Sequence, residues 1–237
     1  MDVREGTISF GEAETWYRVT GEFHPDDAAA PAPLVVLHGG PGATHDYVLS
    51  LADLAEEYAL TRPPGLRGLV LADTAASWAD FATEAGKLRA ELPEDVQATL
   101  ARHEAAGTYD DPEYMEACLV FYSRHVCQIE WPPEVLASFE WLDRDPTVYR
   151  TMNGPSEFHI IGSCKDWQVK DRLHEIDVPT LLVSGRYDEA TPALQQVLLD
   201  GIAGSEWVCF EESSHMPHVE ERERYMSVVG DWLARHD

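Results

Sequence analysis

Two stretches near the start of the chain, Gly6–Phe10 and Thr15–Val19, alternate between apolar and polar residues. Because successive side chains of a β-strand point to opposite faces, such alternation indicates strands with one buried face. Residues 11–13 lie between the two stretches and include a glycine, which suits a turn. The pattern predicts a β-hairpin within residues 1–22.

Later runs are apolar without alternation, which is typical of strands buried on both faces of a sheet. Stretches with helical signals separate them. Buried strands that alternate with helices imply an α/β fold with a largely parallel sheet and helices packed on its faces. The expected strands are Leu34–Leu37, Leu69–Ala72, Val178–Ser184 and, last, Glu206–Phe210, and the expected helices are Leu49–Leu60, Ala193–Ile202 and Glu220–Ala234.

The middle third of the chain has a different texture and consists mainly of helical segments. Asp111 followed by Pro112 is a good helix start, because the aspartate can cap free amides of the first turn and proline suits the first helical position. We interpret this region as a helical lobe inserted between two strands of the sheet. The expected division is residues 1–76 for the first part of the core, 77–170 for the helical cap and 171–237 for the remainder of the core.

The charge of the chain excludes some partners. Asp and Glu number 43 against 17 Lys and Arg, which gives a formal net charge of -26. Nucleic acids and anionic membranes attract clustered Lys and Arg, and the chain has no basic run, so we expect neither as a partner. A hydrophobic content of 44% predicts a packed protein rather than a disordered acidic tail.

No apolar run approaches the roughly 18 residues of a membrane span, and the first thirty residues lack the pattern of a signal peptide. The expected location is therefore the cytoplasm. The four cysteines form no CxxC pair, so neither a zinc knuckle nor a disulfide framework is indicated. No metal or cofactor is expected.

A glycine-rich string follows the first buried run and consists of His38, Gly39, Gly40, Pro41 and Gly42. Backbone amides in such a turn can point at a developing oxyanion, which a side chain with a Cβ would crowd. A plain strand-to-helix turn is the alternative. The chain has neither of the glycine motifs that cradle phosphates in nucleotide-binding folds.

An acid and a histidine follow the last two expected strands, in that order. Asp188 lies just past the Val178–Ser184 run, and His215 lies in the loop after Phe210. Open α/β sheets place their sites at the carboxyl ends of strands, and this order is that of acid and base in α/β-hydrolases. The alternatives are a turn-capping role for Asp188 and a structural loop histidine. A metal site at His215 and His218 is disfavoured, because Pro217 interrupts a continuous helix.

The three loops, taken together and in this order, resemble those of the proline iminopeptidases, α/β-hydrolase serine aminopeptidases that release an N-terminal residue, usually proline. The resemblance implies that the loop at residues 38–42 contributes to the oxyanion hole and that Asp188 and His215 are the catalytic acid and base. It extends to the lobe, where Met152–Phe158 and Lys165–Trp167 resemble the family's cap motif.

The resemblance also implies a pocket for the free amino group of a peptide or aminoacyl substrate. Glu157 corresponds to the family's glutamate that binds this group, and Glu189 corresponds to a second one. Two carboxylates near the nucleophile would pair with an α-ammonium and select substrates with a free N-terminus. The structural alternative for Glu157 is a helix cap after Pro155.

The family's nucleophile is a serine in a G-x-S-x-G turn, and no serine of this chain has that context. The residues before and after positions 55–57 resemble two helices that are far apart in the family. We therefore expect an internal deletion near 55–57 of roughly 50 to 70 residues, which removes a strand–helix–strand block with central strands of the sheet. Asp73, at the end of a strand, is placed as an alternative acid.

The leading hypothesis is a proline iminopeptidase-type hydrolase, using Ser-His-Asp acyl transfer by descent, whose chain as written lacks the serine and is inactive. The first alternative is a non-catalytic protein that binds amino termini. The second is an amide or ester hydrolase of small metabolites, which Glu157 and Glu189 disfavour because they favour a free amine. The sequence leaves the oligomeric state open.

Overall fold

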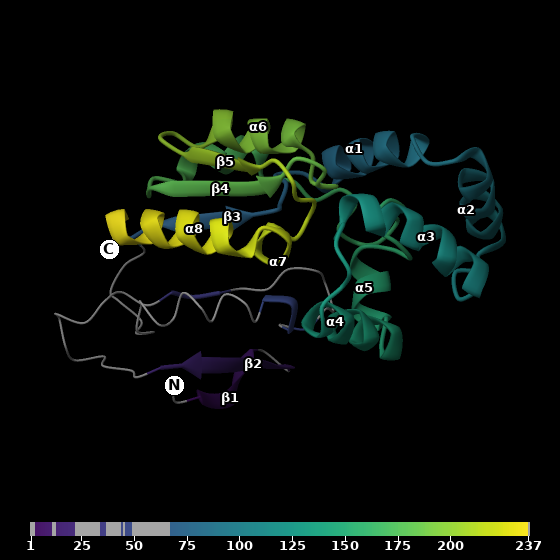
Figure 1. The fold of residues 1–237 in the computed structure, drawn as a ribbon, viewed down its shortest axis with the longest axis horizontal. Coiled ribbons are helices and arrows are strands. Elements are labelled where there is room, and N and C mark those ends of the chain that lie inside the picture. The colour runs from purple at the N-terminus through teal and green to yellow at the C-terminus, as the bar shows by residue number, and fades with distance from the viewer. Residues whose placement is uncertain are drawn as a thin grey trace.

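The computed structural model describes residues 3–10, 13–21, 34–36, 44, 46–48 and 67–236. The expected oxyanion loop at 38–42, the helix at 49–60 and the junction near 55–57 lie outside these residues. The first element is a separate antiparallel hairpin of β1 (Val3–Phe10) and β2 (Ala13–Thr20), as the alternating pattern predicts (Figure 1).

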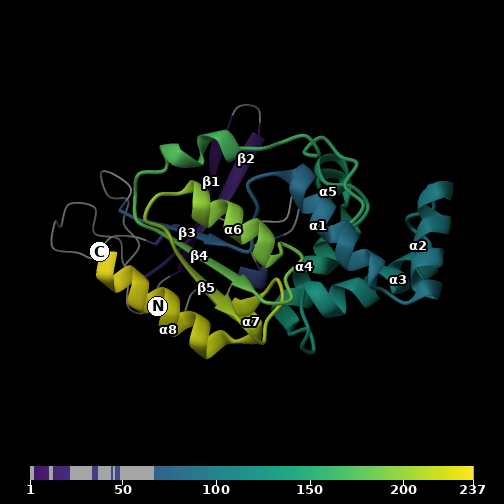
Figure 2. The same cartoon turned by 90° about the horizontal axis from the view of Figure 1, so that it is seen from above.

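Within the described residues, the core sheet has three parallel strands in the order β3 (Leu69–Ala72), β4 (Thr180–Gly185) and β5 (Glu206–Phe210). Helix α8 (Arg222–His236) lies on one face and α6 (Pro192–Gly201) on the other (Figures 1 and 2). All six residues of β4 are buried, because this central strand is covered on both faces. The parallel sheet with helices on its faces is confirmed.

The side chains of β4 alternate between two core clusters, as a strand requires. Leu181 and Val183 pack with Trp232 and other residues of α8, whereas Leu182 packs with Leu198 of α6 on the other face. The alternation fixes the register in which the ends of β4 and β5 meet.

One expectation is wrong. Residues 34–36 form no strand: Val35 is 69% exposed and, within the described part of the chain, no neighbouring strand offers its backbone groups. An apolar run becomes a buried strand only where a partner strand and covering helices exist. The expected helix Glu220–Ala234 is present as α8, which begins at Arg222, and a short helix, α7 (Pro217–Glu220), precedes it.

The middle of the chain forms the expected group of helices, and Figure 1 shows them gathered beside the carboxyl ends of the sheet strands. Asp111 caps α3 by accepting a hydrogen bond from the Glu113 amide at 2.9 Å, as predicted. None of the described helices has the length and apolar character needed to cross a membrane. The helices are α1 (Trp78–Ala90), α2 (Glu94–Ala106), α3 (Pro112–His125), α4 (Pro133–Arg144) and α5 (Thr147–Met152), followed by the 3-10 helix η2 (Lys170–Glu175).

The hydrophobic core of this lobe extends into the sheet domain. Phe121 of α3 and Phe158 pack at its centre, and Ala190 and Met216 from the loops after β4 and β5 belong to the same cluster. Burial of these loop residues fixes the lobe over the carboxyl ends of β4 and β5. The candidate site lies at this contact.

Candidate active site

The loops after β4 and β5 approach each other at Gly185. A Cβ on this glycine would lie 2.0 Å from the carbonyl oxygen of Ser214, so only glycine allows the approach. Two backbone hydrogen bonds join the loops, from the Arg186 amide to Phe210 O at 2.8 Å and from the Tyr187 amide to Ser213 O at 3.0 Å. The contact brings together residues 27 positions apart in the chain.

Asp188 and His215 form a hydrogen-bonded pair in these loops. The imidazole Nδ1 lies 2.8 Å from Asp188 Oδ1, and the amide of Ala190 donates to the same oxygen at 2.7 Å. Since the partner is a carboxylate, Nδ1 carries a proton and Nε2 is the atom free to take one from a substrate or nucleophile. Asp188 is 1% exposed, so the pair is shielded on its acid side.

The environment of His215 stabilises its charged form. Burial alone would lower the pKa of the imidazole, but the charge of Asp188, its hydrogen bond and the charge of Glu189 raise the pKa well above its usual value. A histidine oriented and charged by a buried carboxylate is the geometry of a general base that holds a proton during reaction.

Glu220 of α7 stabilises the loop that carries His215 through hydrogen bonds to its backbone. The sequence did not indicate this role. The carboxylate of Glu220 accepts hydrogen bonds from the backbone amides of Ser214 at 2.9 Å and Met216 at 3.2 Å, on either side of His215. The amide of Gln128 in the lobe also donates to it, at 2.8 Å.

The cap motif places Glu157 in a tight loop after α5. Gly154 has a φ of +145°, and a Cβ there would lie 2.3 Å from His159 O, so glycine is required. The carbonyl of Asn153 accepts the amides of Ile161 and Gly162, which closes the loop.

Tyr149 of α5 positions the glutamate directly. Its hydroxyl donates a 2.5 Å hydrogen bond to Glu157 Oε1. Tyr149 is buried, and burial together with the charge of Glu157 raises the pKa of its hydroxyl well above the usual value, so it stays a donor. No sequence pattern singles out this tyrosine.

Glu189 approaches Glu157 from the core side of the same contact. Glu189 is 2% exposed, and among the described residues its Oε2 has no hydrogen-bond partner. Burial, followed by the charge of Glu157, raises the pKa of Glu189 well above its usual value, and burial likewise raises the pKa of Glu157. Two buried carboxyl groups with an unpartnered oxygen form a site that a cation would stabilise.

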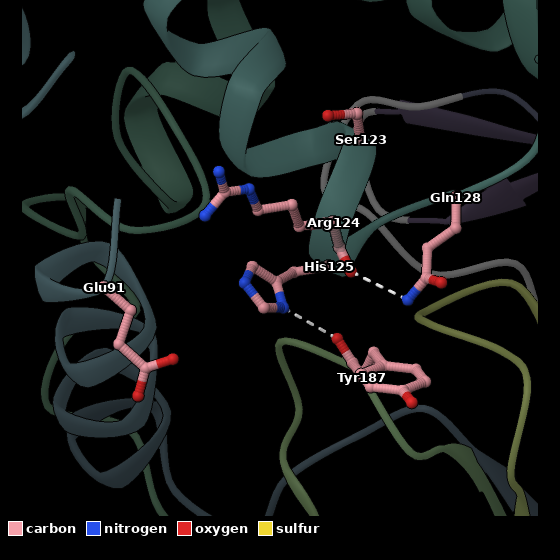
Figure 3. A pocket seen from close by; sticks show the side chains of 6 residues that line it. All are labelled: Glu91, Ser123, Arg124, His125, Gln128 and Tyr187. Atoms are coloured by element: carbon pink, nitrogen blue, oxygen red, sulfur yellow. Dashed lines mark hydrogen bonds between the residues drawn. The ribbon is translucent and has the colours of Figure 1, made fainter. Parts of the chain in front are cut away.

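A depression of about 320 Å³ is lined by lobe residues and by Tyr187 of the Asp188 loop (Figure 3). Asp188, His215, Glu157 and Glu189 are not among its lining residues. At this depression, residues of the lobe form hydrogen bonds with the Asp188 loop. The His125 ring, at the end of α3, bonds to Tyr187 O at 2.8 Å, and the His125 carbonyl accepts the Glu189 amide at 3.2 Å. The depression therefore lies where the lobe contacts the Asp188 loop.

Among the described residues, no group of candidate metal ligands includes His215. The Nε2 of His218 lies 2.8 Å from Tyr47 O, and burial lowers the pKa of this imidazole to about 4. Among the described residues, His103, Asp111 and Glu113 could converge on an ion, but Glu113 already pairs with Arg102 at 2.6 Å.

The parallel sheet, with an acid after β4 paired to a histidine after β5, defines an α/β-hydrolase. Solved structures agree: the crystal structure of VinJ superposes with a TM-score of 0.90 at 39% identity over 99% of both chains. The proline iminopeptidase of Mycobacterium smegmatis gives 0.82 at 33% identity over 98% of both chains.

Curated relatives identify the family. The proline iminopeptidase of Saccharolobus solfataricus is 33% identical over 261 positions, covering 84% of each chain. That of Lactobacillus helveticus is 29% identical over 302 positions, covering all of both chains. No family model matches the chain. The chain belongs to the proline iminopeptidase family and is by family a hydrolase.

Proposed function

We propose that the chain carries the acid–base pair and the amino-group pocket of an enzyme that removes an N-terminal residue, preferably proline, from peptides. The observation that supports this most is the Asp188–His215 pair at 2.8 Å beside two buried glutamates. Glu157 and Glu189 bind the α-ammonium of the substrate, and this fixes the first peptide bond near His215.

In the complete reaction, His215 Nε2 takes the proton of a serine hydroxyl as that oxygen attacks the carbonyl carbon. Asp188 stabilises the imidazolium, which then protonates the leaving amine. Water attacks the acyl intermediate in the second half, with His215 again taking and returning a proton. Backbone amides of the loop at 38–42 stabilise the oxyanion; this role stays a prediction.

We further propose that this chain lacks the nucleophile and does not turn over substrate. None of its serines has the G-x-S-x-G context. The alignment with the Lactobacillus helveticus protein is 302 positions long and includes all 237 residues of this chain. At least 65 positions, the difference between these lengths, therefore have no residue here, which supports a missing block of the expected size.

The proposed division keeps the core in two parts, residues 1–76 and 171–237, with the cap at 77–170. The missing block falls near 55–57 in the first part. Its loss leaves the acid, the base and both pocket glutamates in the second part and the cap, which supports a binding function without turnover.

Binding of amino termini is thus the second candidate function, and the unpartnered Glu189 oxygen favours it. A hydrolase of small-metabolite amides or esters is the third. Calorimetry with prolinamide and N-acetylprolinamide separates them, because only the first has a cationic amine. We expect prolinamide alone to bind, and Glu189→Gln to weaken binding, whereas Glu212→Gln, an exposed control, leaves it unchanged.

Turnover is tested by release of the chromophore from a prolyl-anilide and by labelling with a serine-directed phosphonate. We expect neither above background for the 237-residue chain, and both for the Mycobacterium smegmatis relative as a positive control. Clear labelling would refute the absence of a nucleophile. An intact mass of the protein from its native source then shows whether the shorter chain exists in the cell.

A further inference from the structure

Asp73 stands at the end of β3 in an unusual backbone conformation. Its amide continues the ladder of the sheet by donating to Val183 O at 2.9 Å, but its φ is +49°. Among the residues from 67 to 236 it is the one non-glycine position with a positive φ. Aspartate tolerates this left-handed conformation better than most residues, so the turn directs a carboxyl group rather than a larger side chain.

The carboxyl group of Asp73 meets that of Asp188. The charge of Asp188 and the interaction of its side chain with Asp73 both raise the pKa of Asp73, and neither carboxylate is a hydrogen-bond donor when ionised. In the described chain, Asp73 Oδ1 and Asp188 Oδ2 are both buried and have no hydrogen-bond partner. Asp188 Oδ1 already accepts from His215 and Ala190. One proton between the two carboxyl groups accounts for this arrangement.

Charges from every element around Asp73 bear on where this proton lies. Burial raises the pKa of Asp73 most, followed by the charge of Asp188 after β4; His215 after β5 lowers it, and Glu220 of α7 raises it. Tyr225 of α8 also faces Asp73 and keeps its proton, because burial raises its pKa. Asp188 Oδ1 lies 2.8 Å from the imidazole Nδ1 of His215, which leaves Asp73 as the carboxyl group to which the proton is assigned.

We propose that Asp73 is a positioning residue that stays protonated at neutral pH and donates its proton to Asp188 Oδ2. The hydrogen-bonded series Asp73–Asp188–His215 then carries one negative charge on two carboxyl groups. With Oδ2 held by Asp73, Asp188 keeps Oδ1 directed at the imidazole. The catalytic meaning of this series rests on the proposed function, but the series itself does not.

The test compares two variants that both tolerate a positive φ. Asp73→Asn keeps a hydrogen-bond donor toward Asp188, the side-chain amide, but removes the carboxyl group and its titratable proton. Asp73→Gly removes the whole side chain without backbone strain. Infrared spectra at pH 7 report a protonated carboxyl group, and NMR reports the pKa of His215 and its Nδ1 proton. Neither measurement requires turnover, so the role of Asp73 can still be tested if the proposed function is wrong.

We expect the neutral carboxylic acid band at pH 7 in the unmodified chain to contain a component from Asp73, so that Asp73→Asn lowers its intensity. Because a neutral Asp73 adds no charge, Asp73→Asn shifts the pKa of His215 by less than about 0.3. Asp73→Gly weakens or broadens the Nδ1 proton signal, which Asp73→Asn retains. A fall of about 1 in that pKa in Asp73→Asn would mean an ionised Asp73 and would overturn the proposal. So would an unchanged Nδ1 signal in a folded Asp73→Gly protein.

Discussion

The two halves of the site differ in whether their charged side chains find hydrogen-bond partners within the protein. The acid–base half consists of Asp188 and His215, whose facing atoms bond to each other, and Glu220 fixes the loop from which the histidine projects. The proposed amino-group half consists of Glu157 and Glu189, whose pKa values burial raises and the charge of His215 lowers, and one oxygen of Glu189 has no hydrogen-bond partner in the described chain.

This difference means that the acid–base half is preorganised, whereas the amino-group half is expected to be completed by binding a ligand. Opposite charges stabilise the acid–base half before any substrate arrives, whereas like charges in the amino-group half cost stability until a cation is bound. The halves also rest on different parts of the fold. Both acid–base residues lie on core loops, but the amino-group half needs Glu157 from the lobe to face Glu189 from the core.

The largest expected effect comes from removing support of the lobe. Phe121 is fully buried, and its ring centre lies 4.7 Å from that of Phe158, next to Glu157. Phe121→Ala should lower the free energy of unfolding by about 3 to 5 kcal/mol, because it leaves a cavity in the lobe core. Urea unfolding measures the loss, and calorimetry should show weaker prolinamide binding.

Leu119→Ala on the same helix is the matched control. Leu119 is 49% exposed, so its truncation should change stability by less than about 0.5 kcal/mol. The His215 Nδ1 proton should persist in folded Phe121→Ala protein if the two halves are independent. Its disappearance would instead mean that the contact of His125 with the Asp188 loop couples them.

The next effect concerns the acid–base half alone. Asp188→Asn removes the charge that opposes the burial of His215, so the pKa of His215 should fall below about 6.5, as NMR titration can measure. Stability at pH 6 should fall by about 1.5 to 3 kcal/mol, the range for hydrogen bonds to charged groups.

The pH dependence of that loss has a defined sign. The raised pKa of His215 contributes stability that is complete below the unfolded-state pKa of about 6.5 and is lost as pH rises through the folded-state pKa. The gap between wild type and Asp188→Asn should therefore narrow at alkaline pH. Asp177→Asn, at an exposed position, serves as the control, and a gap that widens with pH would contradict the ion pair.

Much of the core could be predicted from the sequence, because its signals are local. The buried runs at Leu69–Ala72 and Glu206–Phe210 became strands with the expected bounds, and the order of Asp188 and His215 after their strands indicated the pair. Parallel strands bring their carboxyl ends to one edge of the sheet, so the meeting of these loops follows from topology.

What could not be predicted depends on contacts between distant segments. The apolar run at 34–36 looked like a strand, yet pairing is a property of neighbours, which the run itself does not encode. The role of Glu220 depends on the approach of α7 to the loop after β5, and the role of Tyr149 depends on the approach of α5 to the cap loop. Such residues resemble ordinary helix positions until their partners are known.

The smallest effect has the opposite sign and tests the amino-group half. Glu189→Gln should raise the free energy of unfolding at pH 7 to 8 by about 1 kcal/mol, because an uncompensated buried carboxylate costs stability. A raised carboxyl pKa lowers stability as pH rises above the unfolded-state value of about 4.3, so the advantage of the variant should vanish near pH 4. Unfolding at both pH values, with Glu212→Gln as the exposed control, measures it. If Glu189→Gln instead destabilises the protein at pH 7 without ligand, then Glu189 already has a cationic partner within the chain, and the contrast between a satisfied half and an unsatisfied half fails.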